Sequence, residues 1–136
     1  MTILHITPEQ TYEIRHRVMW PDQPFDYVKI ANDNEGLHFG YFVDGKLISV
    51  ISGFFNEETK EAQFRKFATL QEFQSKGYGS QLLSHLIEEF TARGAIRIWC
   101  NARVIATALY ERFGMHKTNQ TFTKLGIDYV VMEKVI

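Results

Sequence analysis

Residues 74 to 83 read QSKGYGSQLL and place two glycines, Gly77 and Gly79, directly before a run of leucines. Apolar residues then recur at helical spacing, which predicts an amphipathic helix: Leu82, Leu83, Leu86, Ile87 and Phe90. Free amides at the start of a helix attract an anion, and the helix dipole adds favourable potential. The stretch is therefore a candidate phosphate-binding loop. A glycine turn between a strand and a helix, without a ligand, is the alternative.

Two common phosphate-binding motifs do not fit this stretch. The dinucleotide fingerprint G-x-G-x-x-G needs a glycine where this chain has Leu82. The nucleoside-triphosphate loop needs a lysine after its glycine, whereas Lys76 precedes Gly77. The shared physics remains, because Gly77 and Gly79 let a phosphate approach the backbone while Lys76 and Ser80 add a charge and a hydroxyl.

The N-terminal third of the chain contains one well-marked helix. Thr7 is a candidate cap, Pro8 suits the first helical position, and Pro21 ends the helix. Arg15 and Arg17 are expected to point away from its apolar face. From Asp22 to Glu35 the pattern predicts a loop with a short helix around residues 27–31.

Strands and two further helices account for the remainder. Strands are expected at 37–43, 46–55, 62–70, 95–102, 116–124 and 128–136, and a helix at 104–113. Asp44-Gly45 favours a hairpin turn, and Gly94 and Gly114 end helices. The prediction is one domain over residues 1–136: a mixed α/β fold with a mostly antiparallel sheet of six or seven strands, in the order α-β-β-β-α-β-α-β-β.

Composition narrows the function classes. Apolar residues make up 45% of the chain, the net charge is -1, and no basic block extends beyond Arg65-Lys66, which argues against nucleic-acid binding. No apolar run approaches the ~18 residues of a membrane helix, and no signal peptide precedes the first helix. We expect a cytoplasmic protein that does not bind membranes. The single Cys100 lies in an apolar run and is expected to be a buried small hydrophobe.

The motif Gln74-Ser75-Lys76-Gly77-Tyr78-Gly79-Ser80 resembles the Q/R-x-x-G-x-G/A signature of the GNAT family of N-acetyltransferases. The order of elements is similar to that family over nearly the whole chain. The later helix ends in Tyr-Glu-Arg-Phe-Gly-Met, where Ala106, Tyr110 and Gly114 match the family pattern.

The resemblance implies an acetyl-CoA-dependent N-acetyltransferase that needs no metal. The motif amides, Ser75 to Ser80, would bind the pyrophosphate, and the preceding strand would pair with the pantetheine arm. Tyr110 would protonate the departing sulfur, although packing in its helix is the alternative role. The implied cofactor-binding residues are Phe67, Ala68, Thr69, Gln74, Ser75, Lys76, Gly77, Tyr78, Gly79, Ser80, Asn101 and Arg103.

Two positions depart from the family pattern. Gln63 stands where some relatives carry a glutamate base, and an amide cannot accept the proton. Glu61, Glu35, His38, His116 and a chain of water molecules are the open alternatives. Arg103 stands where many relatives have an asparagine that holds the pantetheine arm, and Asn101 lies two residues earlier. Either residue is a candidate for that contact.

The acceptor is not specified by the sequence. We expect a primary amine of a small molecule or of a peptide or protein. An acidic loop with Asp22, Asp26, Asp33 and Glu35 would attract a cationic amine, and the candidate aromatic walls are Trp20, Phe25, Tyr27 and Phe122. Two rival functions stay open: an inactive module that only binds CoA, and a nucleotide-binding protein. A homodimer is an open alternative to a monomer.

Overall fold

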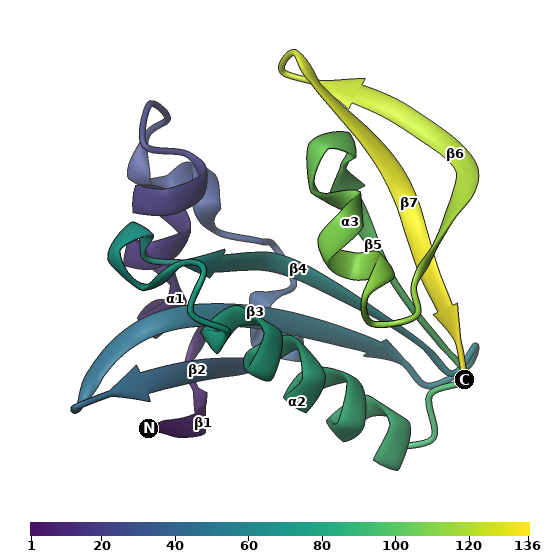
Figure 1. The fold of residues 1–136 in the computed structure, drawn as a ribbon, viewed down its shortest axis with the longest axis horizontal. Helices are drawn as coiled ribbons and strands as arrows, with labels where there is room; N and C mark the ends of the chain where they lie inside the picture. Colours follow the sequence, from purple (N-terminus) through teal and green to yellow (C-terminus); the bar gives the residue numbers. More distant parts are fainter.

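Seven strands form one sheet in the order β1-β2-β3-β4-β5-β7-β6 in the computed structural model, which describes residues 1–136 (Figure 1). The strands are β1 (Thr2–Ile6), β2 (Leu37–Val43), β3 (Lys46–Asn56), β4 (Glu61–Thr69), β5 (Arg97–Arg103), β6 (His116–Lys124) and β7 (Ile127–Val135). All neighbouring pairs are antiparallel except β4 and β5, which run parallel. The predicted mixed, mostly antiparallel fold is confirmed.

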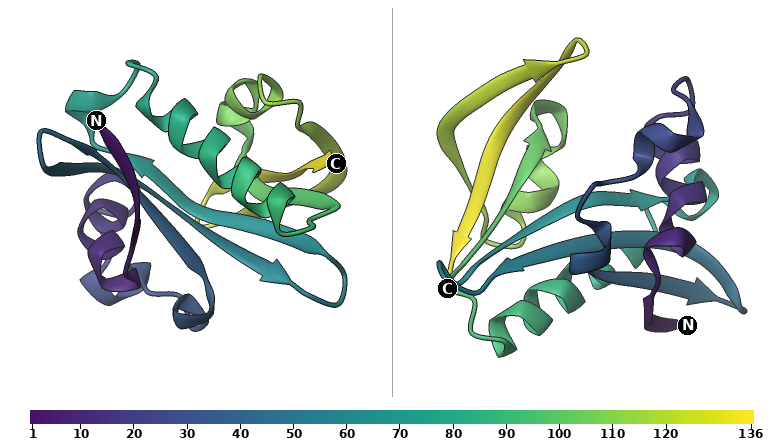
Figure 2. Two further views of the ribbon diagram at one scale, coloured as in Figure 1. Left: turned by 90° about the horizontal axis from the view of Figure 1, so that it is seen from below. Right: turned by 180° about the vertical axis from the view of Figure 1, so that it is seen from behind.

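Helices cover both faces of this sheet. The α-helices are α1 (Pro8–Ile14), α2 (Tyr78–Ala92) and α3 (Thr107–Glu111). A π-helix, η1 (Arg15–Met19), continues α1, and four short 3₁₀ turns are η2 (Phe25–Val28), η3 (Asp33–Glu35), η4 (Gln71–Phe73) and η5 (Val104–Ala106). Figure 2 shows α1 and α2 on opposite faces of the strands β2 to β4. The buried side of α2, with Leu82, Leu83, Leu86 and Phe90, forms much of the core. No helix has both the length and the apolar character that crossing a membrane requires.

Local signals placed most of these elements correctly. Thr7 and Gln10 cap each other reciprocally: the Thr7 amide donates to Gln10 Oε1 over 2.8 Å, and the Gln10 amide donates to Thr7 Oγ1 over 3.3 Å. Asp44 and Gly45 both have positive φ, at 50° and 78°, as a tight hairpin turn requires. Capping chemistry and turn residues act within a few positions of the chain, so a single sequence reveals them.

Four local predictions were wrong. The order of elements starts with β1, which pairs with β2 from Thr2 opposite Phe42 to Ile6 opposite His38. Its residues alternate poorly between buried and exposed, so they lack the signature of a strand. The short helix after Pro21 is η2, two residues earlier than expected, and the helix predicted for 104–113 is divided between η5 and the short α3. Arg15, expected on the outer face of its helix, is completely buried.

The strands β4 and β5 separate soon after they meet. They pair only where Glu61, Ala62 and Gln63 oppose Arg97, Ile98 and Trp99. From Phe64 onward β4 has no partner on its β5 side, while β3 continues to hold its other edge as far as Thr69. Because β5 pairs along its whole length with β7, the sheet opens into two arms that diverge from near the C-terminus (Figure 1).

A buried ion pair fastens the loop between η1 and β2 to the sheet. Arg15 donates through Nη1 and Nη2 to the two carboxylate oxygens of Asp33, each over 2.9 Å, and through Nη2 to Ser52 Oγ over 2.8 Å. The amide of Ile30 donates to Asp33 as well, and His38 bonds both Ser52 and the Asp33 carbonyl. Burial alone would raise the pKa of Asp33, but the hydrogen bonds from Arg15 and Ile30 lower it overall.

Replacing Asp33 with Asn tests this anchor. The substitution leaves the Arg15 charge buried without a counter-ion, so the free energy of unfolding at pH 7 should fall by roughly 3–5 kcal/mol in a urea titration. Asp26→Asn is the matched control because Asp26 pairs with Lys29 on the exposed surface, and it should leave the urea midpoint unchanged. The pKa of Asp33 is lower in the folded state than in the unfolded state. The carboxylate therefore stabilises the fold at pH values above its unfolded pKa of about 3.9, and this stabilisation is lost as the pH falls through its folded pKa. Equal midpoints for the two variants would contradict the anchoring role.

Candidate active site

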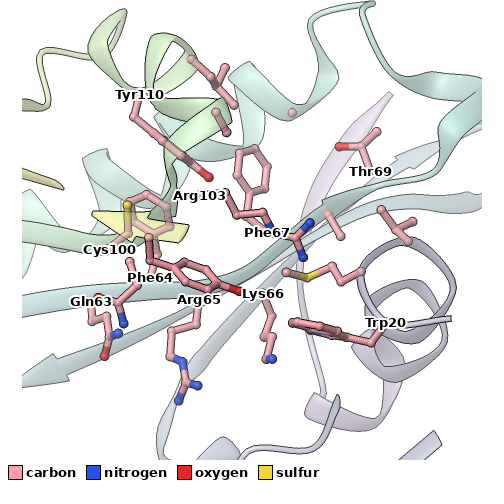
Figure 3. Close-up of a pocket in the computed structure, with 18 of the residues that line it drawn as sticks. Trp20, Gln63, Phe64, Arg65, Lys66, Phe67, Thr69, Cys100, Arg103 and Tyr110 are labelled. Carbon is pink, nitrogen blue, oxygen red and sulfur yellow. The ribbon is translucent and has the colours of Figure 1, made fainter. Parts of the chain in front are cut away.

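A cleft of about 1210 Å³ occupies the opening between β4 and β5 (Figure 3). One wall is β4 from Gln63 to Thr69, and the opposite wall is built from the end of β5, from α3 and from the hairpin of β6 and β7. The 74–80 loop lies at one end, and η1 with the loop after it lies at the other. The cleft therefore follows from the divergence of the two strands, and four distant segments line it.

A β-bulge in β4 sets the direction of the side chains in the middle of the cleft. Ser52 opposes Arg65 and Val50 opposes Ala68, so Lys66 and Phe67 share one residue of β3 as their partner. Lys66 has a left-handed backbone with φ 55°. The bulge allows two consecutive side chains, Arg65 and Lys66, to extend on the side of β4 away from Tyr110 (Figure 3).

The loop before α2 presents unpaired amides to the cleft. No protein acceptor receives a hydrogen bond from the amides of residues 75–80, and the first backbone bond at this end of α2 is donated by Gln81 to the Gly77 carbonyl. Gln74 fixes the loop to the end of β4, because its Nε2 donates to the Thr69 carbonyl over 2.8 Å. The loop is thus a row of donors at a helix N-terminus, which is an arrangement that binds phosphate groups.

The two glycines are required for different reasons. Gly77 has φ 86° and nothing within 4 Å of an added Cβ, so its backbone conformation is what excludes other residues. Gly79 lies in the first turn of α2, where a Cβ would come within 3.2 Å of Phe67 Cζ and Thr69 Oγ1. Gly77 shapes the loop, and Gly79 lets α2 approach β4 closely.

The cleft collects most of the residues that the sequence singled out. Those that line it are Phe67, Ala68, Thr69, Gln74, Ser75, Gly77, Gly79, Ser80, Asn101, Arg103 and Tyr110. Two others turn away from it. The Lys76 ammonium lies over the Phe73 ring, and the Tyr78 ring packs on Tyr41 with ring centroids 5.0 Å apart. Neither side chain is among those that line the cleft.

Tyr110 reaches the cleft from α3 and stays protonated. Burial raises its pKa above the usual value of about 10, and the neighbouring Cys100 adds to the effect. Its ring packs on Phe64 with centroids 5.6 Å apart, and its hydroxyl points into the cleft (Figure 3). Burial also raises the pKa of the Cys100 thiol to about 12. Cys100 is thus a buried, uncharged small residue, as expected, whereas the Tyr110 phenol keeps its proton at the edge of the cleft.

None of the candidate basic side chains from the sequence lines the cleft. Glu61 pairs with Arg97 over 3.5 Å, His38 belongs to the buried Arg15 network, and neither Glu35 nor His116 lines the cleft. Gln63 does line it, but its amide accepts no proton. In fact no aspartate, glutamate or histidine is among the lining residues.

The charge of the cleft is the opposite of what the acidic 22–35 loop suggested. Asp33 forms an ion pair with Arg15, Asp26 forms one with Lys29, and no acidic residue of that loop lines the cleft. Cations line it instead: Lys29, Arg65, Lys66, Arg103, Arg112 and Lys124. Of the proposed aromatic walls, Trp20, Tyr27 and Phe122 are present, whereas Phe25 packs on Tyr12 and His16 outside. The Arg65-Lys66 pair was the one local signal of this charge.

Lys66 is a charged group held in an unfavourable place. Burial and then the nearby charges of Arg65, Arg15 and Lys124 lower the pKa of Lys66 to about 8. Below pH 8 the folded chain carries this buried charge, while the unfolded chain exposes it to water. As the pH rises from 8 toward the unfolded pKa of about 10.4, the folded state loses the proton first and its stability increases.

Lys66→Met should therefore stabilise the protein at neutral pH. Methionine keeps most of the apolar stem and removes the buried charge, so the Tm at pH 7 should rise by a few degrees in a thermal melt. The gain should shrink as the pH approaches 10. Lys117→Met, on the exposed part of β6, is the control and should give no such gain. A lower Tm for Lys66→Met at pH 7, or a gain independent of pH, would contradict this account.

Comparison with known proteins identifies the family and supports the fold. The model of the Acetyltransferase (GNAT) family matches residues 4–115. The uncharacterized N-acetyltransferase YitI of Bacillus subtilis (strain 168) is 35% identical over 96% of this chain and 93% of its own length.

Two solved structures share the fold. A putative N-acetyltransferase from Lactobacillus plantarum superposes with a TM-score of 0.86 over 98% of this chain and 97% of that one, at 20% identity. A Bacillus subtilis acetyltransferase in complex with CoA gives 0.76 over 98% and 97%, at 17% identity. The family model matches most of this chain, and the Bacillus subtilis relative is 35% identical over nearly all of it. This chain therefore belongs to the GNAT family of acetyltransferases.

Proposed function

We propose that this protein transfers the acetyl group of acetyl-CoA to a primary amine, with residues 74–80, the free edge of β4 and Tyr110 as its machinery. One observation carries the proposal: the unpaired amides of the 75–80 loop continue into the unpaired edge of β4, which leads to the Tyr110 hydroxyl. Acetyl-CoA carries a diphosphate, then two amides and then a thioester. This is the order in which the loop, the edge of β4 and the Tyr110 hydroxyl would meet them.

Each part of acetyl-CoA meets a matching group. The pyrophosphate would accept hydrogen bonds from the amides at the start of α2, where the helix dipole also favours negative charge. The pantetheine arm has two amides, and the edge of β4 at Phe67, Ala68 and Thr69 offers backbone donors and acceptors for them. Asn101 and Arg103 line the opposite wall and are the candidates for a further contact with this arm.

The acetyl group would then lie at the point where β4 and β5 separate. The amine nitrogen attacks the thioester carbonyl, a C–N bond forms and the C–S bond breaks. A free backbone amide of β4 can stabilise the negative charge that develops on the carbonyl oxygen. The thiolate leaves toward Tyr110, whose phenol donates its proton to the sulfur, and the proton that the nitrogen loses as the amide forms restores the phenol.

The acceptor must lose a proton before it attacks, and the cleft has no carboxylate or histidine to take it. The cations that line the cleft supply a different means, since like charges disfavour an ammonium ion and lower its pKa. The field of Arg65 and Lys66 would raise the share of free amine at neutral pH, and water can carry the proton away. Because this mechanism needs no carboxylate base, a glutamine at position 63 is compatible with it.

Tyr110→Phe tests the role of the phenol. Loss of the proton donor should reduce kcat for release of CoA thiol by about 10² or more, with the dissociation constant of acetyl-CoA unchanged. Tyr12→Phe is the control, because Tyr12 packs on Phe25 outside the cleft and should not alter kcat. Unchanged thiol release by Tyr110→Phe would exclude Tyr110 as the acid. If the wild type binds CoA but releases no thiol with any amine tested, the inactive CoA-binding module is the better description.

Gly77→Ala tests the phosphate loop, and the chain provides a matched control in Gly45→Ala. Both glycines have left-handed φ, and neither has an atom within 4 Å of an added Cβ, so both substitutions cost similar backbone strain of roughly 1–2 kcal/mol. Only Gly77 belongs to the loop. Isothermal titration should show weaker binding of CoA to Gly77→Ala by about tenfold, and unchanged binding to Gly45→Ala. Equal affinities in the two variants would remove the loop from the CoA site, and protection of the wild type against thermal unfolding by ATP rather than CoA would favour a nucleotide-binding protein.

A further inference from the structure

Four cations line one region of the cleft, and two of them, Arg65 and Lys66, are the residues whose field would favour the free amine. We call Arg65, Lys66, Arg103 and Lys124 the cationic wall; they come from β4, β5 and β6 and all line the cleft. None of them forms an ion pair with an acidic residue of the protein. Arg65, Lys66 and Arg103 are half-buried and Lys124 is exposed, so the wall holds three partly desolvated positive charges without an acidic partner, which lowers stability in the absence of a ligand.

Trp20 joins two members of the wall. The Lys66 ammonium lies 5.9 Å from the centre of the Trp20 ring, and the Arg103 guanidinium lies 5.4 Å from it. The influence of Lys124 on the pKa of Lys66 places that lysine nearby as well. Figure 3 shows Arg65, Lys66 and Trp20 below β4, on the other side from Tyr110. Trp20, directly after η1, and side chains from β4, β5 and β6 thus converge on one region.

Two hydrogen-bond donors in this region lack an acceptor. Arg103 Nη2 and Trp20 Nε1 are buried and have no partner in the protein. Buried donors are almost always satisfied, and an unsatisfied one is expensive. Both belong to side chains that line the cleft, whose charged residues are all cations. A ligand with negatively charged oxygens would supply acceptors to these side chains and balance part of the positive charge of the wall.

The phosphates of CoA do not account for this wall. Their proposed site is the row of amides at residues 75–80, at the α2 end of the cleft, whereas the wall lies beside η1 and the β6–β7 hairpin. Arg65 and Lys66 also extend on the side of β4 away from Tyr110, which is the side from which an acceptor would reach the thioester (Figure 3). The wall belongs to the acceptor half of the cleft.

We propose that the acceptor is a small primary amine that also carries an anionic group, a carboxylate or a phosphate ester, which the cationic wall and Trp20 bind. This inference rests on the proposed acetyl transfer and specifies its substrate class. The anionic group anchors the acceptor by charge-assisted hydrogen bonds, and the chain between that group and the amine places the nitrogen near the opening of β4 and β5. The positive field around the amine at the same time favours its neutral form.

Matched amines that differ in one charge test the proposal on the wild-type protein. The pairs are β-alanine with β-alaninamide, and phosphoethanolamine with ethanolamine. Thiol release should give a kcat/KM about tenfold or more higher for the anionic member of at least one pair, because a charge-assisted hydrogen bond to a buried cation is worth at least that factor. The pair that responds identifies carboxylate or phosphate. Equal or higher kcat/KM for both neutral members would overturn the proposal, as would acetylation of acidic peptides with no turnover of either anionic amine.

Binding of CoA, measured by calorimetry in the absence of any amine, tests the proposed function separately from the anionic acceptor. No binding of CoA would refute the proposed function itself. Binding of CoA together with turnover of neutral amines at equal rates would refute only the anionic acceptor. The preference for the anionic member should also weaken as the pH rises through 8, because Lys66 then loses its charge.

Two variants of the wall locate the preference. In Lys66→Met and Lys124→Gln the ratio of kcat/KM between the anionic and the neutral amine should fall about tenfold, with KM for acetyl-CoA unchanged. Lys117→Gln is the control, because Lys117 lies on the same strand as Lys124 but does not line the cleft, and it should keep the wild-type ratio. Because both amines are measured on the same preparation, partial misfolding of a variant cancels from the ratio. A raised KM for acetyl-CoA with an unchanged ratio would assign the wall to the cofactor and overturn the proposal.

Discussion

The parting of β4 and β5 after three residue pairs is the constraint on which the rest of this structure depends. Each strand is fully held on its other side, β4 by β3 and β5 by β7, so the two arms of the sheet remain stable although their facing edges are unpaired. Such edges expose backbone N–H and C=O groups that lack hydrogen-bond partners within the sheet. In this protein the edges form the walls of a cleft, where a ligand with amide groups can pair with them.

Small irregularities convert that opening into a site. The bulge at Lys66 directs two neighbouring cations to one side of β4 and leaves the edge of the strand available on the other. The hydrogen bond from Gln74 to Thr69 closes the loop so that its amides face the same opening. Gly79 lets α2 approach β4 without a clash. Each departure from a regular strand or helix therefore has an identifiable consequence in the cleft.

Charge is distributed unevenly between the interior of the protein and its cleft. The one deeply buried ion pair, between Arg15 and Asp33, has a bidentate geometry and fixes the loop between η1 and β2. The cations of the cleft have no such counterparts, and the depressed pKa of Lys66 records the cost. Proteins commonly accept lower stability at functional sites. In the proposed mechanism the same uncompensated charge binds the anionic group of the acceptor and lowers the pKa of its amine.

Helix caps, hairpin turns and amphipathic helices could be predicted from the sequence alone, because the interactions that form them join residues close together in the chain. The Thr7 and Gln10 capping box, the Asp44-Gly45 hairpin and the amphipathic stripe of α2 each act over a few residues, and the glycine motif before α2 indicated the family. Only the tertiary structure decided that Thr2–Ile6 is an edge strand, because its pairing partner lies more than thirty residues away. It also decided that Arg15 is buried and that the acidic loop faces away from the cleft, while cations from β4, β5 and β6 meet beside Trp20. Side chains from segments far apart in the chain acquire a common electrostatic environment only when the sheet brings them together, and no local pattern contains that distance.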